Sequence, residues 1–524
     1  QEAGMSPDDA QRTDDRRDPR RRGFIPETLD QAVIAVPLLR KLEEEGDLRK
    51  ANRDLAPRMY RVIIDLNLAY SEGRERAQMR VHEMLHEAME HIPAEHRRSS
   101  EGMLTSERHR VEQYLFASLS ADAIRALVRS DRSPGRKGKV IGQPRPHAIH
   151  RIWEDFEVGP LVTRSVRTVK ADAALASFAA SGEGIVWAVA DSGIQGDHPH
   201  FRAHRNLDPD PLVTHEWFTP EKSDPLTDAF GHGTHVAGII AGENRAGKTP
   251  IRAFERVLDE ESEVAFQPLR TDLIAGMAPR CKLVSLKVLD DDGRGLSSSL
   301  IAAIAHVQRV NEYGRRIRIH GLNMSVGYEF DPMWFACGQS PLCREVDRLV
   351  RSGVVVVVAA GNTGYGAIQP DFMGPQSAGM DLTINDPGNA DLAITVGSTH
   401  RDSPFTNGVS YFSSKGPTGD GRLKPDLVAP GEKIVSCAAG KSRTDAQREI
   451  GGRRTVDYID QSGTSMAAPH VSGVIAAFLS IRREFRGRPE TVKQIFLDSA
   501  TDLRRDPYFQ GRGLVDLMRA IQSV

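Results

Sequence analysis

Apolar residues follow two different patterns along this chain, and the change falls near residue 160. In YRVIIDLNL (60–68), apolar and polar side chains alternate, which is typical of a strand with one buried face. The elements that follow are predicted as a helix, a strand, a short helix capped by Ser120 and a last strand, at 73–91, 111–119, 120–130 and 148–158. Residues 26–158 are therefore expected to form a small α+β domain, with an extra helical segment at 26–56 and a disordered tail at 1–25 before it.

Beyond residue 160, short segments rich in Val, Ile and Ala follow one another closely. They lie at 184–190, 235–242, 282–289, 296–310, 318–326 and 353–361. Buried strands separated by helical segments predict parallel β-α-β units with helices on both faces of the sheet. Residues 160–524 are therefore expected to form one α/β domain. Active sites in such sheets lie at the carboxyl ends of the strands, so polar residues just after apolar runs are the candidates.

Composition adds few constraints. The 524 residues are 39% hydrophobic and 27% charged, with a formal net charge of −2, which suits a globular protein and favours no nucleic-acid partner. The longest apolar run, GVVVVVAAG, is too short to span a membrane. Cys337 and Cys343 are close enough in sequence for one local disulfide, while Cys281 and Cys437 are expected to be inert core thiols.

The first residues are polar and contain no apolar core of a signal peptide. A native start at Met5 would favour a cytoplasmic protein. Because the chain begins at Gln1, a secreted protein whose signal peptide was already removed is the alternative.

Four polar residues stand where an α/β domain places its active site. Asp191 follows the apolar run at 184–190, and Asn362 follows the most apolar run in the chain. His232 begins the apolar helix of FGHGTHVAGIIAG, and Ser465 opens the helix of SGTSMAAPHVSG. A serine hydroxyl becomes a nucleophile when an imidazole takes its proton, and a carboxylate must orient that imidazole. An amide donor and an N–H at a helix N-terminus then stabilise the developing oxyanion.

Each of these residues alone also has an ordinary structural explanation. Asp191 suits an Asx turn, His232 a core histidine and Asn362 a turn, while Ser465 is interpreted as both a helix cap and a nucleophile. Their occurrence together at the ends of strands and helices of one domain favours catalysis. Residues 191–193, Asp-Ser-Gly, also match an aspartic-protease signature, but that chemistry needs a second carboxylate, and the sequence has no second copy.

The blocks that carry these residues resemble the subtilisin-like serine proteases, or subtilases, over residues 182–520. The matching blocks are VADSGI, HGTHVAGIIAG, GMAPRCKLVSLKVLDDDG, LNMSVG, VVVAAGN, KPDLVAPG and SGTSMAAPHVSG. The resemblance implies a three-layer, subtilisin-like α/β fold with a mostly parallel sheet, and a serine endopeptidase acting through an acyl-enzyme. In it Asp191 would orient His232, the general base and acid, Ser465 would be the nucleophile and Asn362 an oxyanion donor. It implies no cofactor for catalysis, with structural calcium possible.

By the same resemblance, two backbone segments would pair with an extended protein or peptide substrate and wall its first specificity pocket. These residues are Ser325, Val326, Gly327, Ala359, Ala360 and Gly361. Two stretches depart from the family pattern: a long polar insert at 243–272, expected to be a surface loop, and an irregular stretch at 363–384. Acidic residues at 290–292 and Asp386 suggest a preference for basic substrate residues, with solvated loops or calcium binding as alternatives.

The predicted order of strands and helices over 60–158 resembles the subtilisin propeptide. That resemblance implies an autoprocessed proenzyme, whose N-terminal domain inhibits it intramolecularly and is cut off within 155–180. In the alternative, a retained N-terminal domain blocks the cleft and the chain is a non-catalytic binding or regulatory protein.

A further motif, HEMLH at 82–86, has the H-E-x-x-H spacing of zinc metalloproteases, with His82, Glu83 and His86 on a helix and Glu107 as a third ligand. The competing interpretation is favoured, because Val81 and its apolar neighbours form the buried stripe of that helix. Both histidines would then lie on its wet face.

Overall fold

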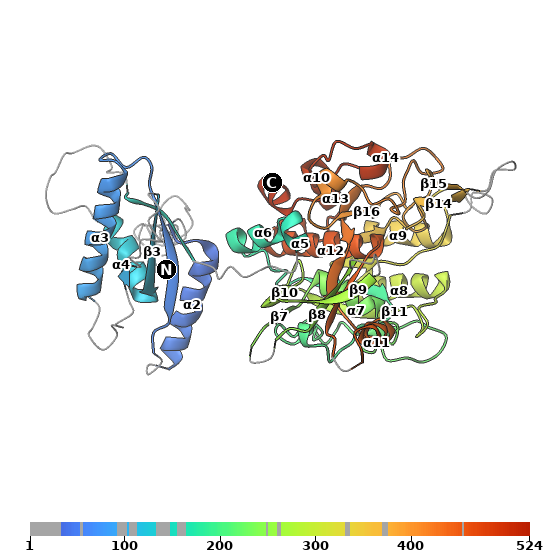
Figure 1. The fold of residues 1–524 in the computed structure, drawn as a ribbon, viewed down its shortest axis with the longest axis horizontal. Helices are drawn as coiled ribbons and strands as arrows, with labels where there is room; N and C mark the ends of the chain where they lie inside the picture. Colours follow the sequence, from blue (N-terminus) through green and yellow to red (C-terminus); the bar gives the residue numbers. More distant parts are fainter. Residues whose placement is uncertain are drawn as a thin grey trace, which may run out of the picture. The chain divides into compact units, whose positions relative to one another are not determined.

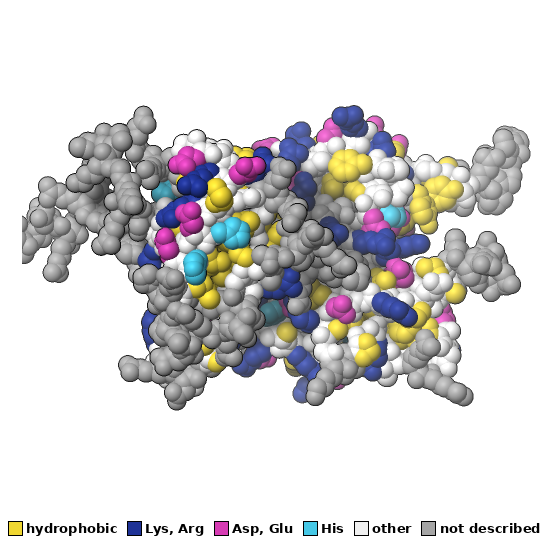
Figure 2. All heavy atoms as spheres, turned by 60° about the vertical axis from the view of Figure 1, so that its left-hand side comes forward, with side chains coloured by type: hydrophobic (Ala, Val, Ile, Leu, Met, Phe, Trp, Pro, Cys, Tyr) yellow, Lys and Arg dark blue, Asp and Glu magenta, His cyan; other side chains and the backbone are white. Residues whose placement is uncertain are grey.

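The computed structural model contains two compact units, Gln1–Glu157 and Val158–Val524 (Figure 1). The described residues are 33–52, 56–91, 102–103, 113–132, 147–154, 164–247, 250–258, 264–330, 336–368, 376–452 and 455–524. The tail expected at 1–25 lies outside them. On the face drawn in Figure 2, basic and acidic side chains are interspersed, in keeping with the formal net charge of −2.

The N-terminal unit contains a four-stranded antiparallel sheet in the order β2-β3-β1-β4. Its elements are α2 (Val36–Ala51), β1 (Met59–Leu66), α3 (Arg74–His91), β2 (Gly102–Met103), β3 (Tyr114–Ser120), α4 (Ala121–Arg132) and β4 (Ile149–Glu154). In the central strand β1, Tyr60, Val62, Ile64 and Leu66 are buried and alternate with more exposed residues, as the alternating sequence predicts.

From β1 to β4 the elements follow the β-α-β-β-α-β order of a split βαβ fold. Helices α2, α3 and α4 bury Leu38, Val81 and Ile124 in one hydrophobic core with the sheet. The N–H of Ala123 donates to Ser120 Oγ at 3.2 Å, which confirms the predicted cap of α4. The α+β character expected for this region is confirmed.

The C-terminal unit is built on a seven-stranded sheet whose strands all run parallel, in the order β17-β16-β13-β12-β5-β11-β6. These strands are β5 (Val186–Asp191), β6 (Glu216–Trp217), β11 (Lys282–Lys287), β12 (Gly321–Met324), β13 (Val355–Ala359), β16 (Ile394–His400) and β17 (Leu427–Glu432). Strand β13 shows why the runs are continuously apolar: Val355 and Val357 face one hydrophobic core, while Val356 and Val358 face another.

Helices cover both faces of this sheet, which gives the three-layer α/β fold that was expected. The core that includes Val355 also contains α7 (His232–Ile240) and α12 (Thr464–Ile481), and the core that includes Val356 contains α8 (Ser297–Val310) and α9 (Pro341–Arg351). The remaining helices are α5 (Arg164–Thr168), α6 (Ala171–Phe178), α10 (Pro404–Asn407), α11 (Gly440–Glu449), α13 (Pro489–Ser499), α14 (Pro507–Gln510) and α15 (Leu517–Gln522).

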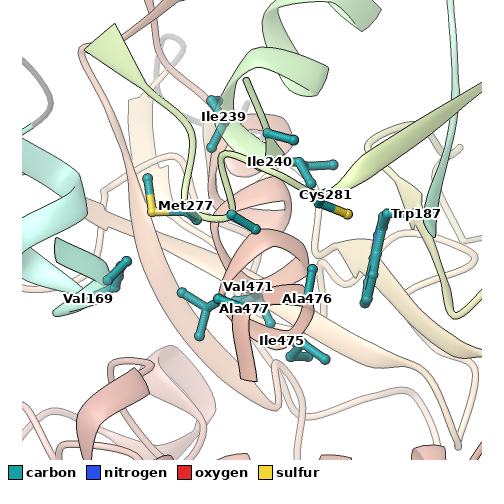
Figure 3. Close-up of a cluster of buried hydrophobic side chains, with 14 of the residues drawn as sticks. Val169, Trp187, Ile239, Ile240, Met277, Cys281, Val471, Ile475, Ala476 and Ala477 are labelled. Carbon is teal, nitrogen blue, oxygen red and sulfur yellow. The ribbon is translucent and has the colours of Figure 1, made fainter. Parts of the chain in front are cut away.

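Helix α12 is the central helix of the first core. Figure 3 shows Val471 and Ile475 of α12 near Trp187 of β5, with Ile239 and Ile240 of α7 close by. By length and composition α12 is the one described helix that could cross a membrane, but 89% of its apolar window is buried inside the fold. Its apolar character is therefore explained by its place in the core.

The polar insert at 243–272 is not the surface loop that was expected, because it forms three strands. The first, β7 (Glu243–Arg245), pairs with β10 (Leu273–Ala275), which directly follows the insert. The other two, β8 (Ala253–Leu258) and β9 (Val264–Leu269), extend a sheet of order β18-β19-β8-β9 with β18 (Ile434–Cys437) and β19 (Tyr458–Gln461). The irregular stretch at 363–384 contains a hairpin, β14 (Tyr365–Ile368) with β15 (Gln376–Gly379).

All four cysteines are free and buried, so Cys337 and Cys343 form no local disulfide. Burial raises the pKa of the Cys281 and Cys437 thiols well above the usual range. Both therefore behave as the inert core thiols that were expected.

Candidate active site

Asp191 occupies the carboxyl end of the interior strand β5. Strand β5 has β11 on one side and β12 on the other. The later strands of the chain are thus added on both sides of β5, so β5 lies at a topological switch point. The Asp191 side chain is 1% exposed. Its Oδ1 accepts hydrogen bonds from the Ser192 N–H at 2.8 Å and from His232 Nδ1 at 2.7 Å.

His232 is the first residue of α7, and glycines on both sides let the helix approach β5. Gly231, the N-cap, has a φ of 93°, a conformation that favours glycine. A Cβ on Gly233 would lie 2.2 Å from the carbonyl oxygen of Gly193, so only glycine fits there. Close packing of helix against strand is what brings the imidazole to Asp191.

A second buried carboxylate, Asp228, caps the same helix. It accepts hydrogen bonds from the Gly231 N–H at 2.7 Å, the Thr234 N–H at 2.8 Å and the Ser192 hydroxyl at 2.8 Å. Burial raises the pKa of Asp228. This residue was missed in the sequence because it lies three residues before the N-cap Gly231 and not at the N-cap position, where a capping side chain is expected.

The electrostatics of His232 reflect both burial and this acidic neighbourhood. Burial by itself lowers the pKa of the imidazole, but the charge and hydrogen bond of Asp191 outweigh it, with a further contribution from Asp228. The net result is a raised pKa for His232. Asp191 therefore stabilises the imidazolium form.

Ser465 is the second residue of α12, after an N-cap at Gly463 that makes no side-chain cap. The interpretation of Ser465 as a helix cap is therefore wrong. Its Oγ donates to the carbonyl oxygen of Ser325 at 3.0 Å, and Ser325 Oγ donates to the carbonyl oxygen of Ser465 at 2.9 Å. This reciprocal pair holds the start of α12 against the end of β12, with the Ser465 hydroxyl proton directed at Ser325.

The reciprocal pair belongs to a buried polar chain. Asn323 donates through Nδ2 to Ser325 Oγ at 2.9 Å and accepts from Ser472 Oγ at 2.8 Å. Asn323 is 0% exposed, so the Asn-x-Ser sequence that begins there is not accessible to a glycosylating enzyme. The chain of bonds links β12 to two turns of α12.

Asn362 follows β13 at the same edge of the sheet. Its Oδ1 accepts from the Thr464 N–H at 2.9 Å and from Thr464 Oγ1 at 3.1 Å. Because a backbone N–H only donates, the carbonyl end of the Asn362 amide must face Thr464. Its Nδ2 donor is therefore left for another acceptor.

One cavity of about 460 Å³ brings these groups together. His232, Asn362 and Ser465 line it, as do five of the six residues expected in the substrate groove: Ser325, Val326, Gly327, Ala359 and Gly361. The sixth, Ala360, lies behind the wall. Its N–H donates to Val396 and its carbonyl oxygen accepts from Asn385, both at 3.0 Å.

The rest of the cavity lining is apolar or uncharged. It consists of Phe230, Leu289, Gly293, Gly295, Leu296, Ser297, Leu300, Tyr328, Thr363, Asn385 and Thr464. Three of the four acids that suggested a basic substrate are engaged in other contacts. Asp386 is 1% exposed and accepts from Asn389 at 2.9 Å, Asp290 accepts from two N–H groups of its own turn, and Asp291 pairs with Lys287 at 2.9 Å.

The H-E-x-x-H segment lies on α3. His82, Glu83 and His86 are exposed, while Val81 is buried, and Glu83 pairs with Arg80 at 3.2 Å. Glu107 lies outside the described residues. Within the described residues, no group of three or more His, Cys, Asp or Glu side chains is placed to hold a metal ion.

In a comparison with known protein families, residues 182–513 match the subtilase family. Serine protease AprX of Bacillus subtilis is 29% identical over 351 residues, covering 65% of this chain and 67% of that protein. Subtilisin E of Bacillus subtilis is 28% identical over 376 residues, covering 72% of this chain and 74% of that protein. Pyrolysin of Pyrococcus furiosus is 30% identical over 332 residues, covering 56% of this chain and 21% of that protein.

Proposed function

Because the chain belongs to the subtilase family and is a subtilisin-like serine endopeptidase, we propose that Asp191, His232 and Ser465 are its catalytic triad. The observation that carries this proposal is the 2.7 Å hydrogen bond between Asp191 and His232, whose imidazole lines the same cavity as Ser465 and Asn362. The bond fixes the tautomer in which Nδ1 carries the proton and donates it to Asp191, which leaves Nε2 as the base.

The reaction then proceeds by acyl transfer. His232 takes the proton of the Ser465 hydroxyl as Oγ attacks the scissile carbonyl carbon. The oxyanion that forms accepts hydrogen bonds from Asn362 Nδ2 and from the Ser465 N–H at the start of α12. His232 gives its proton to the departing amine, leaving an acyl-enzyme on Ser465. A water molecule, deprotonated by His232, hydrolyses that ester and restores the hydroxyl.

The lining of the cavity supports a preference for apolar and uncharged substrate side chains. Leu289, Leu296 and Leu300 contribute an aliphatic wall, and Thr363 and Asn385 contribute neutral polar groups. The backbone of the two segments Ser325–Gly327 and Ala359–Gly361 would pair with the main chain of an extended peptide. Pairing through the main chain allows cleavage of many sequences. A peptide-library digest should therefore show apolar residues enriched near the cleaved bond. Enrichment of Arg and Lys would contradict this preference.

We further propose that the chain is made as a proenzyme and that its N-terminal unit is an intramolecular inhibitor. The support is architectural: this unit is compact, has a hydrophobic core of its own and a split βαβ fold, and lies before the catalytic unit in the chain. Cleavage within 155–180 would separate the two units.

Incubation of the purified full chain tests both proposals. The wild type should lose the mass of its N-terminal unit with time, and it should be labelled by a fluorophosphonate. Ser465→Ala, the matched control, should stay full-length and unlabelled. A wild type that persists intact and unlabelled would support the non-catalytic alternative.

Catalysis by these residues uses no cofactor. If the protein binds calcium, the proposed role of the ion is structural only. A chelator should therefore leave the initial rate of fluorophosphonate labelling unchanged. Loss of labelling together with a lowered melting temperature would indicate a structural calcium ion. Loss of peptidase activity with labelling intact would favour metal chemistry at His82 and His86.

A further inference from the structure

Strand β19 connects directly to the catalytic serine. Only Ser462 and Gly463 separate its last residue from Thr464 and Ser465 at the start of α12. The same strand also contacts the helix that carries His232, because His235 Nε2 lies 3.2 Å from the carbonyl oxygen of Ile459. A displacement of β19 would therefore reach the nucleophile and the base together.

The insert that the sequence pattern did not explain pairs with this strand. β8 runs parallel to β19, with Ala253 opposite Tyr458 and Phe254 opposite Ile459. Phe254 and Ile459 also share a small hydrophobic core with Val456 and residues of α11. The insert is thus built onto β19 by both hydrogen bonds and apolar contacts.

Two arginines of the insert region clamp the two ends of β19. Arg252 donates to the Asp457 carboxylate at 2.8 and 3.3 Å, just before the strand. Arg256 holds Asp460 inside the strand by four contacts. The backbone N–H of Arg256 donates to Oδ1 at 2.8 Å. In its guanidinium, Nε lies 3.4 and 3.3 Å from the two carboxylate oxygens, and Nη2 donates to the Asp460 carbonyl oxygen at 2.9 Å.

The Arg256–Asp460 contact stands out because the acid is deeply buried. The Asp460 side chain is 2% exposed, so without its cation it would be an unpaired charge inside the protein. The guanidinium is further confined by the Phe266 ring, whose centroid is 6.0 Å away. A guanidinium reaches a carboxylate and a carbonyl from separate nitrogens held in one plane, a geometry that the single nitrogen of an ammonium group does not reproduce.

We propose that Arg256 is a positioning residue for catalysis: it holds Asp460, and through β19 it sets the place of Thr464 and Ser465. The proposal rests on the function assigned above to Ser465. Thr464 in turn orients the Asn362 amide, so the position of β19 also affects the proposed oxyanion donor. The walls of the substrate cavity come instead from the segments after β12 and β13 and from residues 289–300. Removing Arg256 should therefore impair turnover and leave substrate binding intact.

Arg252 offers a matched control. The two arginine side chains are 43% and 42% exposed, and each joins the same insert through an Arg–Asp pair to β19 or to the residue just before it. Asp457, however, lies at the far end of β19 from Ser465. With full-length protein and a chromogenic peptide substrate, Arg256→Ala should lower kcat by about 10²-fold with KM unchanged, the scale of a misplaced nucleophile. Arg252→Ala should lower the melting temperature similarly but leave kcat near the wild-type value.

Two more variants keep the test decisive. Adding Asp460→Asn to Arg256→Ala removes the buried unpaired charge and should restore part of the lost kcat. Arg256→Lys retains the charge, so that the protein folds even where the alanine variant does not, but it loses the fork and should still turn over more slowly than wild type. Equal kcat for both alanine variants, or a kcat of wild-type size in Arg256→Lys, would overturn the proposal. Failure of the wild type itself to be labelled at Ser465 would instead contradict the proposed triad.

Discussion

At the scale of single residues, the candidate site is held by neighbours that are themselves not part of the proposed triad. Asp228 fixes the start of α7, Ser325 fixes the start of α12, and Thr464 fixes the Asn362 amide. Each makes a bond that decides which way a reacting group points. Their removal should therefore change turnover more than substrate affinity.

Thr464 and Asn362 provide the first test of this view. Asn362→Leu should lower kcat by about 10²–10³-fold, the cost of losing one oxyanion-hole donor. Thr464→Val removes one of the two bonds to Asn362 Oδ1 and keeps the backbone N–H, so a loss of a few-fold is expected, the worth of one hydrogen bond of about 1 kcal/mol. Steady-state kinetics measure both. Thr464→Ser keeps the hydroxyl and should retain wild-type kcat; a loss there as large as in the valine variant would contradict the assignment.

The pH dependence of the reaction should report the Asp191–His232 pair. Only the neutral imidazole accepts the serine proton, so kcat/KM should rise with pH as His232 loses its proton. Because Asp191 raises the pKa of His232, the midpoint should lie above the ordinary value of 6.5. The rate of fluorophosphonate labelling from about pH 5 to about pH 9 measures it directly. In Asp191→Asn the stabilising charge is gone, and the midpoint of any residual activity should move downward; an unchanged midpoint would mean that another group titrates.

At the scale of elements, the sequence predicted those whose pattern is local. The alternating residues of β1, the continuous apolar run of β13 and the capped start of α4 are all visible within a few residues. The residues proposed as the triad were selected by the same local signal, because Asp191, His232 and Ser465 stand at the ends of such runs. The bonds made by Ser325 and Thr464 were not, since they join residues more than a hundred positions apart.

The strands of the insert at 243–272 were not predicted from the sequence for the same reason. Its strand β8, AFERVL, carries charged residues at positions where a buried strand would be apolar. Arg256 is satisfied by Asp460, 204 residues later, so a segment that looks solvated by itself is paired in the fold. Nothing local to 243–272 indicates that partner.

Helices α7 and α12, with the turn after β5, bury several neutral histidines, and these should govern acid stability. Burial lowers the pKa of His198 and His470 to about 4, and that of His200 and His235 to about 3. In the unfolded chain each would titrate near 6.5, so the unfolded state binds more protons once the pH falls below that value. The stability is therefore complete above about pH 6.5 and is lost as the pH falls toward about 4.

Urea unfolding of Ser465→Ala at several pH values measures this loss without self-digestion. Each buried histidine should add up to about 1.4 kcal/mol per pH unit to the slope of the unfolding free energy. His470→Leu removes one titrating group whose Nε2 has no partner among the described residues, and it should flatten the slope. His82→Leu, at an exposed position, is the control and should leave the slope as it is. Equal slopes in all three proteins would refute the role of the buried histidines.

At the scale of the whole molecule, the chain has separate hydrophobic cores in its two units. No described residue is shared between the core of the N-terminal unit and those of the catalytic unit. Proteins built in this way unfold unit by unit unless the units stabilise each other. The unfolding behaviour therefore bears directly on whether the N-terminal unit acts as a bound inhibitor.

Ile64→Ala tests this because Ile64 is 0% exposed in the central strand of the N-terminal sheet. The cavity should destabilise that unit by about 2–5 kcal/mol. In the Ser465→Ala background, calorimetry should show the transition of the N-terminal unit moving to lower temperature, with that of the catalytic unit moving less. In the active chain the same substitution should speed the appearance of peptidase activity, because a less stable inhibitory unit restrains the enzyme less. Ile475→Ala, in the core around α12, should instead lower the catalytic transition. Unchanged kinetics of activation in Ile64→Ala, despite its lowered transition, would show that the N-terminal unit does not restrain the enzyme.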